Sequence, residues 1–133
     1  MLEDLKKKIF SYLSGSGALN SHISGRVYYI ENEKTDPTYP YLVFQFISGN
    51  SDRDTGTRYE DITMQVTLYC KTSIEASESG AAADSMLDGS EAQIVLTNYN
   101  VLGIDRISPP RENKTFIGNW QWSADYQIQL EKK

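Results

Sequence analysis

The sequence predicts an α+β fold, a two-layer sandwich in which a mostly antiparallel sheet of about five strands has two helices packed on one face. The chain has 133 residues, 39% apolar and 11% aromatic, which is enough for a single domain over residues 1–133. Segments 62–71 and 120–130 alternate between apolar and polar residues, as half-buried strands do. Only segments 2–13 and 73–87 have the pattern of long helices, and two helices cannot cover both faces of such a sheet.

The first predicted element is an amphipathic helix over residues 2–13. Its apolar residues fall near one stripe, namely Leu2, Leu5, Ile9 and Leu13. Gly15 and Gly17 are expected to end it, because glycine readily takes the left-handed conformation that closes a helix. Residues 18–23 are expected to add a turn of helix, and residues 26–30 a short strand.

Two polar segments flank the next predicted strand. Residues 31–40 are expected to form a loop, which Pro37 and Pro40 restrict. Residues 41–47 are a nearly continuous apolar run, typical of a strand with little solvent on either face. The thirteen residues 49–61 are polar and predict a long loop, whereas a hairpin needs only about two to five residues to turn. A loop of that length is usually functional or disordered.

The second helix is predicted over residues 73–87. Thr72 or Ser73 is expected to be its N-cap, and small residues on its apolar side would let it lie close to the sheet. Gly80 is expected to weaken it by up to about 1 kcal/mol relative to alanine.

Three further strands complete the prediction. Residues 91–97 are ambiguous and are assigned to a short strand, and residues 101–108 to a strand that stops at the prolines that follow. Residues 109–114 are expected to form a third polar loop. The last strand lies within residues 116–130, and its two tryptophans are expected to face the core: Trp120 and Trp122.

No constellation of residues indicates catalysis or a cofactor. His22 is the only histidine and Cys70 the only cysteine, so neither a zinc site of the usual ligand types nor a specific catalytic triad is expected. Residues 50–61 partly follow the spacing of a calcium loop, but Thr55 stands where the turn glycine belongs and Asp61 where the bidentate glutamate belongs. We therefore predict no metal site and no enzyme.

The charge and the apolar pattern also limit the class of protein. The net charge is −5, and the run Lys6–Lys8 is the only basic cluster, which argues against a protein that grips nucleic acid. Neither a signal peptide nor a membrane span is expected from the apolar pattern, and a single cysteine fits a reducing compartment. A soluble intracellular product is the expectation.

Four features together resemble the tail-completion, or tail-terminator (head–tail joining), proteins of long-tailed bacteriophages and prophages. These are the Tyr-Pro entry in 39–44, the polar insert with Asp-Arg-Asp-Thr at 52–55, the alternating strand 59–69 and the alanine-rich helix after it. The N-terminal helix and the tryptophan-containing last strand fit the same pattern. The resemblance covers nearly the whole chain in the order of its elements.

The resemblance implies a structural virion protein without enzymatic activity or cofactor. Such a protein is made in the bacterial cytoplasm and forms a ring, expected to be a hexamer, that caps the tail tube, ends its polymerisation and joins the tail to the head connector. Its implied partners are its own copies, the tail tube protein and the head-completion or connector protein, with DNA passing through the lumen. The alternatives are another connector or tube component, or a bacterial cytosolic α+β ligand-binding domain.

The resemblance also assigns a role to the three polar segments 31–40, 49–61 and 109–114. They are expected to be mobile in the free subunit and ordered by partners. Mixed charge within one segment suits contacts in which one patch meets a different patch of the next subunit. The candidate interface residues are Asp52, Arg53, Asp54, Arg58, Arg111 and Lys114.

Overall fold

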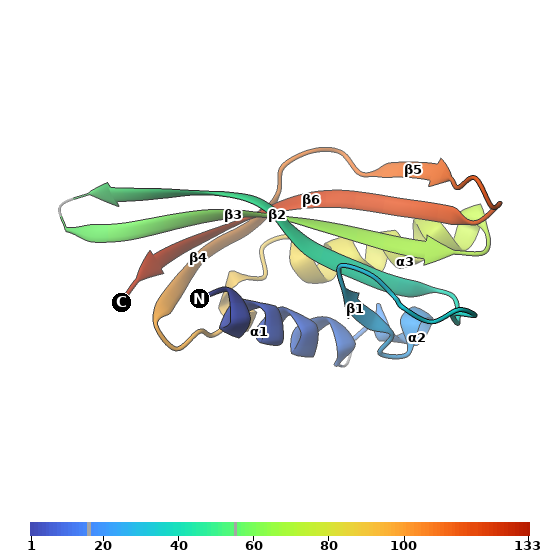
Figure 1. The fold of residues 1–133 in the computed structure, drawn as a ribbon, viewed down its shortest axis with the longest axis horizontal. Coiled ribbons are helices and arrows are strands. Elements are labelled where there is room, and N and C mark those ends of the chain that lie inside the picture. Colours follow the sequence, from blue (N-terminus) through green and yellow to red (C-terminus); the bar gives the residue numbers. More distant parts are fainter. Residues whose placement is uncertain (16, 55) are drawn as a thin grey trace.

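The computed structural model describes residues 1–15, 17–54 and 56–133, with only the backbone at residue 54, and confirms the predicted α+β sandwich (Figure 1). The described part contains one sheet of six strands in the order β1-β2-β3-β6-β4, with β5 also paired to β6. All pairs are antiparallel except β1 with β2. In chain order the elements are α1 (Leu2–Ser14), α2 (Asn20–Ile23), β1 (Val27–Tyr29), β2 (Tyr41–Asp54), β3 (Thr57–Cys70), α3 (Ser73–Leu87), the 3₁₀ helix η1 (Glu91–Gln93), β4 (Tyr99–Arg106), β5 (Arg111–Lys114) and β6 (Trp120–Lys132).

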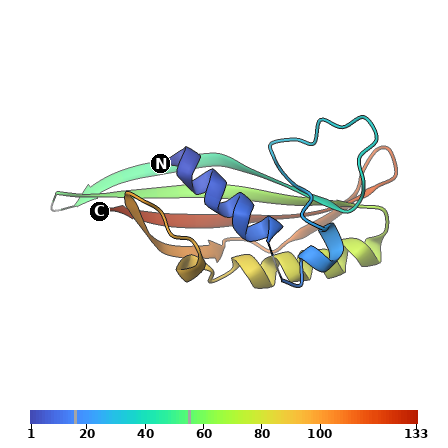
Figure 2. The same ribbon diagram turned by 90° about the horizontal axis from the view of Figure 1, so that it is seen from below.

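The helices lie together on one face of the sheet (Figure 2). Both long helices were predicted, and Leu5, Ile9 and Leu13 of the apolar stripe of α1 are buried, whereas Leu2 at its first turn is exposed. Thr72 is the N-cap of α3, and its Oγ1 accepts a hydrogen bond from the Glu75 backbone N–H at 3.1 Å. No helix within residues 1–15, 17–54 and 56–133 is long and apolar enough to cross a membrane.

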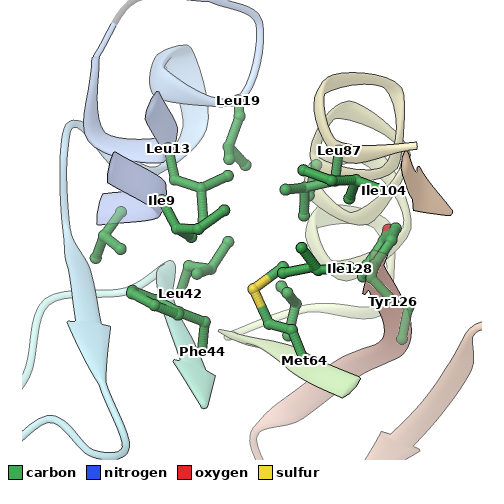
Figure 3. Close-up of a cluster of buried hydrophobic side chains, with 14 of the residues drawn as sticks. Ile9, Leu13, Leu19, Leu42, Phe44, Met64, Leu87, Ile104, Tyr126 and Ile128 are labelled. Carbon is green, nitrogen blue, oxygen red and sulfur yellow. The ribbon is translucent and has the colours of Figure 1, made fainter. Parts of the chain in front are cut away.

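The core fills the space between the helices and the sheet (Figure 3). β3 and β6 each turn alternate side chains into it, as the period-two pattern predicts. Apolar residues of α1 and α3 face them, and β2 adds apolar residues from the same side of the sheet. The largest fully buried side chains include Phe44, Met64, Leu87, Tyr126 and Leu13.

A polar network ties α3 to two strands at the edge of this core. The Tyr126 hydroxyl donates to Asp84 Oδ1 at 2.7 Å, and Arg106 Nη1 lies 2.8 Å from Asp84 Oδ2. Burial raises the pKa of Tyr126 well above its usual range, and the hydrogen bond to Asp84 acts in the same direction. The network satisfies a tyrosine hydroxyl that would be costly to bury alone.

Gly80 is a point of close approach between α3 and the sheet. A Cβ at this position would lie 2.4 Å from Cδ1 and Nε1 of Trp122. Trp122 is almost fully buried, and its indole occupies the space where a larger residue would project from the helix. The glycine that weakens the helix is therefore what lets α3 pack against β6.

The prediction of a long loop at 49–61 is wrong. β2 and β3 stay paired from Tyr41↔Tyr69 to Asp54↔Thr57, so the segment is the outer part of one long β-hairpin. A register shift between Phe46 and Ser48 marks where it leaves the core. Apolar alternation reports burial of a strand face rather than strand formation, so a hairpin that reaches past the core can be polar on both faces.

Three smaller predictions also differ from the structure. Residues 109–114 are not all loop, because β5 pairs with β6. Residues 91–97 contain η1 and no strand among the described residues, although their side chains alternate in burial like those of a strand. Gly15 ends α1 with φ −77° rather than in the left-handed region, which Gly17 occupies at φ +128°. Residue 16 of this turn lies outside the described residues.

Cys70 is expected to resist chemical modification. Its side chain is fully buried on β3 under α3, and burial raises the pKa of the thiol to about 11. Because the thiolate is the nucleophile, alkylation by iodoacetamide at pH 8 should be at least about 100-fold slower in the folded chain than in urea. Mass spectrometry of labelled protein measures both rates, and fast labelling of the native chain would show that the contact between α3 and β3 opens.

Candidate assembly surface

The β2–β3 hairpin extends beyond the helices as an arm (Figure 1, left). We call its outer part, residues 50–54 and 56–60, the hairpin arm. β6 accompanies the arm as far as the pair Tyr59↔Glu131, so β6 supports the base of the arm, and the pairs Arg53↔Arg58 and Asp54↔Thr57 lie beyond it. The side chains of Asp52, Arg53 and Arg58 are exposed on it. The side chain of Asp54 lies outside the described residues, and its backbone pairs with Thr57.

The arm brings cations together. Arg53 lies directly opposite Arg58 across the hairpin. Both line a notch of about 380 Å³ whose other walls include Lys132 and Lys133. Like charges that face each other across strands destabilise a sheet, so this arrangement is unfavourable within the isolated chain.

Acidic neighbours only partly neutralise the notch. Arg58 Nε is 3.6 Å from Glu60 Oε1, and Glu60 also accepts a hydrogen bond from the Ser51 hydroxyl. Asp52 Oδ1 accepts instead from the Arg53 backbone N–H at 2.8 Å. Four cationic side chains therefore line the notch, while the arm beside it also carries Asp52 and Glu60.

The structure does not bring the other two candidate residues to this place. Arg111 and Lys114 lie on β5, where Lys114 pairs with Trp120 at the start of β6. The arm lies beside the far end of β6, about 36 Å away at roughly 3.3 Å per residue. Arg111 has a partner in its own chain, since its Nη2 is 3.6 Å from Asp125 Oδ1. The six predicted residues thus form two groups at opposite ends of the sheet.

The sheet face opposite the helices carries a row of aromatic rings instead of a covering helix in the described part of the chain. Tyr41 stacks on Tyr69 with ring centroids 5.0 Å apart, and Tyr28 and Tyr39 contact Tyr41 from either side. Desolvation, together with the neighbouring tyrosines, raises the pKa of Tyr41 to about 12. The rest of this face is Thr, Gln and Ser, which suits a contact surface rather than a ligand pocket.

The residues that partly follow the spacing of a calcium loop lie on paired strands in the structure. Asn50 and Asp61 face each other across paired strands, so the backbone does not curl around a central point. Thr55 lies outside the described residues. Among those described, no group of three His, Cys, Asp or Glu side chains could hold a metal ion.

Sequence reasoning missed four residues of interest. Lys132 and Lys133 line the notch because β6 lies beside β3, and no pattern in the nearby sequence predicts this pairing. Phe116 and Ile117 were placed at the start of the last strand, but they form the exposed tip of the β5–β6 turn. Two large apolar residues beside a glycine were the available signal for such a turn.

Comparison with known proteins decides the family. The family model described as "Tail completion protein gp17" matches residues 7–128. The chain belongs to this family. Tail completion proteins are structural components of phage tails, and the chain is accordingly a virion structural protein of this kind.

Solved structures show how widely the fold of this tail completion protein is shared. A chain from the virion of a native gene transfer agent particle superposes with a TM-score of 0.81 at 13% identity, over 96% of this chain and 94% of that chain. A second solved chain has a TM-score of 0.60 at 14% identity, covering 100% of this chain and 96% of its own length. At such identities the likeness concerns the fold alone. Among curated proteins none matches the sequence.

Proposed function

We propose that this tail completion protein is the tail terminator: it forms a ring, a hexamer, that caps the tail tube, ends tube polymerisation and joins the tail to the head. The ring sits at the tail-to-head junction of the virion. Its partners are its own copies, the tail tube protein and the head-completion or connector protein, and DNA passes through its lumen.

The hairpin arm is the observation that carries this proposal. It projects past the helices and gathers Arg53, Arg58, Lys132 and Lys133 around one notch. Within one chain this costs free energy, because Arg53 lies directly opposite Arg58 and like charges that face each other destabilise a sheet. A carboxylate-bearing surface of a neighbouring subunit or of the tube would relieve that repulsion, so the arm is suited to assembly.

The distribution of the candidate residues favours a ring over a two-fold dimer. One charged group lies on the arm and the other, with Arg111 and Lys114, lies at the opposite end of the sheet. Contacts between different patches on successive copies generate rings when the rotation closes. The mobility of these three segments in the free subunit stays a prediction. Segment 49–61 belongs to the β2–β3 hairpin and segment 109–114 contains β5, whereas segment 31–40 is irregular.

Electron microscopy of tail tubes with and without the purified chain tests the proposal. We expect rings at one end of each tube, tubes that stop lengthening, and capped tails that join to heads in a reconstitution assay. Sedimentation velocity reports whether the ring also forms without tubes. Binding along the side of the tube, or tubes that lengthen equally with and without the chain, would contradict the role.

A further inference from the structure

An apolar groove runs between α1 and the edge strand β1. It has a volume of about 350 Å³ and is lined by Lys6, Lys7, Phe10, Ser11, Tyr29 and Phe44. Phe44 is fully buried at its floor, whereas Phe10 is 44% exposed on its wall. A second hollow of about 610 Å³, toward residues 31–34, shares Phe10 and Tyr29 with it. The lysines form a basic rim, and Lys6 Nζ lies 4.7 Å from the centroid of the Tyr29 ring.

The same chain carries an apolar projection of matching character. Phe116 and Ile117 are 106% and 78% exposed at the tip of the β5–β6 turn, and we call this pair the apolar tip. The turn is held in place: the Thr115 N–H donates to the Asn119 carbonyl at 2.6 Å, and Asn119 Nδ2 donates to the Tyr39 hydroxyl at 2.9 Å. Two large apolar side chains are therefore displayed by a structured turn rather than by a loose one.

The groove and the tip lie toward different edges of the sheet. β1 is one edge strand, and β5 pairs with the far side of β6, so β2, β3 and β6 lie between them. Four strand spacings separate β1 from β5, about 19 Å at roughly 4.8 Å each. The tip does not enter the groove of its own chain, but the groove of a second copy is open to it.

We propose that the apolar tip of one copy inserts into the groove of the next, as the repeating contact of the ring. This inference rests on the proposed function and names the two segments of successive copies that touch in the ring. Both features are apolar, one is convex and the other concave, and each is uncovered in the described chain. Lys114 lies two residues before the tip, and the hollow beside the groove is lined by Glu31 and Glu33, so opposite charges can meet at this contact. Because the two patches differ, the contact is heterologous and propagates around a ring.

The contact is also small, which fits a ring rather than a stable dimer. One aromatic and one aliphatic side chain bury a few hundred Å² at most, below the roughly 1,000 Å² expected of an independent stable interface. Each subunit in a closed ring makes the contact twice, and binding to a tube adds further contacts. A single contact between tip and groove is therefore weak, and closing of the ring strengthens the assembly.

Cysteine cross-linking tests the pairing while retaining Phe116, the aromatic residue of the tip. Ser11→Cys places a thiol in the groove and Ile117→Cys places one on the tip, and the native Cys70 is buried and unreactive. The two single variants are oxidised with diamide separately and as a mixture, at concentrations up to about 1 mM and on tail tubes. We expect a disulfide-linked dimer in the mixture only, and a ladder ending in a closed oligomer for the chain with both substitutions.

Two controls make the result decisive. Val95→Cys, at another apolar residue that is 70% exposed, should give no dimer with Ser11→Cys. Adding Phe116→Ser to the tip variant should lower the yield at least about tenfold, because it removes the aromatic anchor. Dimers within a single variant, or rings that form on tubes without any cross-link in the mixture, would overturn this pairing but leave the ring intact. Absence of rings altogether, with capping also lost, would instead overturn the proposed function.

Discussion

Gly80→Ala should destabilise the protein by up to about 2 kcal/mol, although alanine is the better helix former. In an open helix the substitution would gain about 1 kcal/mol. Here the new Cβ would lie 2.4 Å from the Trp122 indole, so α3 or the indole must move. Overpacking of a filled core costs about 1–3 kcal/mol and outweighs the gain in propensity. Urea unfolding followed by circular dichroism measures the difference, and Gly80→Val should cost more.

The neighbouring residue supplies a matched control. Ala81 is exposed on the same helix, so Ala81→Gly should cost about 1 kcal/mol by propensity alone. If propensity governed both positions, the two substitutions would change the free energy of unfolding in opposite directions. We expect both to lower it. Trp122→Leu should reduce the cost of Gly80→Ala in a double-mutant cycle, because the smaller side chain makes room.

Elements that bury one face were predictable from the sequence. The alternation in 62–71 places its apolar residues in the core, and the stripe of 2–13 places Leu5, Ile9 and Leu13 there, because the spacing of apolar residues follows the buried face. The N-cap Thr72 was predictable for a local reason, since its side chain satisfies a backbone N–H three residues later. The role of Gly80 was not, because its constraint comes from a tryptophan more than forty residues away.

The candidate assembly surface was only partly predictable. The charges of 49–61 were noticed, but their place on paired strands depends on long-range pairing that polar residues do not signal. The notch combines Arg53 and Arg58 with lysines at the end of β6, so it exists only in the folded chain. The apolar tip could not be predicted either, because Phe116 and Ile117 are residue types that are usually buried, and only the structure shows that they are exposed.

Reversal of both arm arginines should abolish tail joining without unfolding the chain. Arg53→Glu/Arg58→Glu again places two like charges opposite each other, so the repulsion between these two positions is kept. The charge that these positions present to a partner changes from positive to negative. The reversal also places a carboxylate beside Glu60, whose side chain is only 12% exposed, so a modest loss of stability is expected along with the change of charge. At an interface, charges of the wrong sign cost several kcal/mol, so we expect at least about a hundredfold fewer joined tails.

A reconstitution assay with heads and capped tails measures this effect, with circular dichroism as the check on folding. Lys8→Glu changes the net charge by as much as each single reversal, at an exposed residue of α1 away from the arm, and should leave joining unchanged. Arg53→Gln/Arg58→Gln should be intermediate and should lower the salt dependence of assembly, since attraction is lost without new repulsion. Normal ring formation and normal joining by the double reversal would show that the cations of the arm serve no assembly contact.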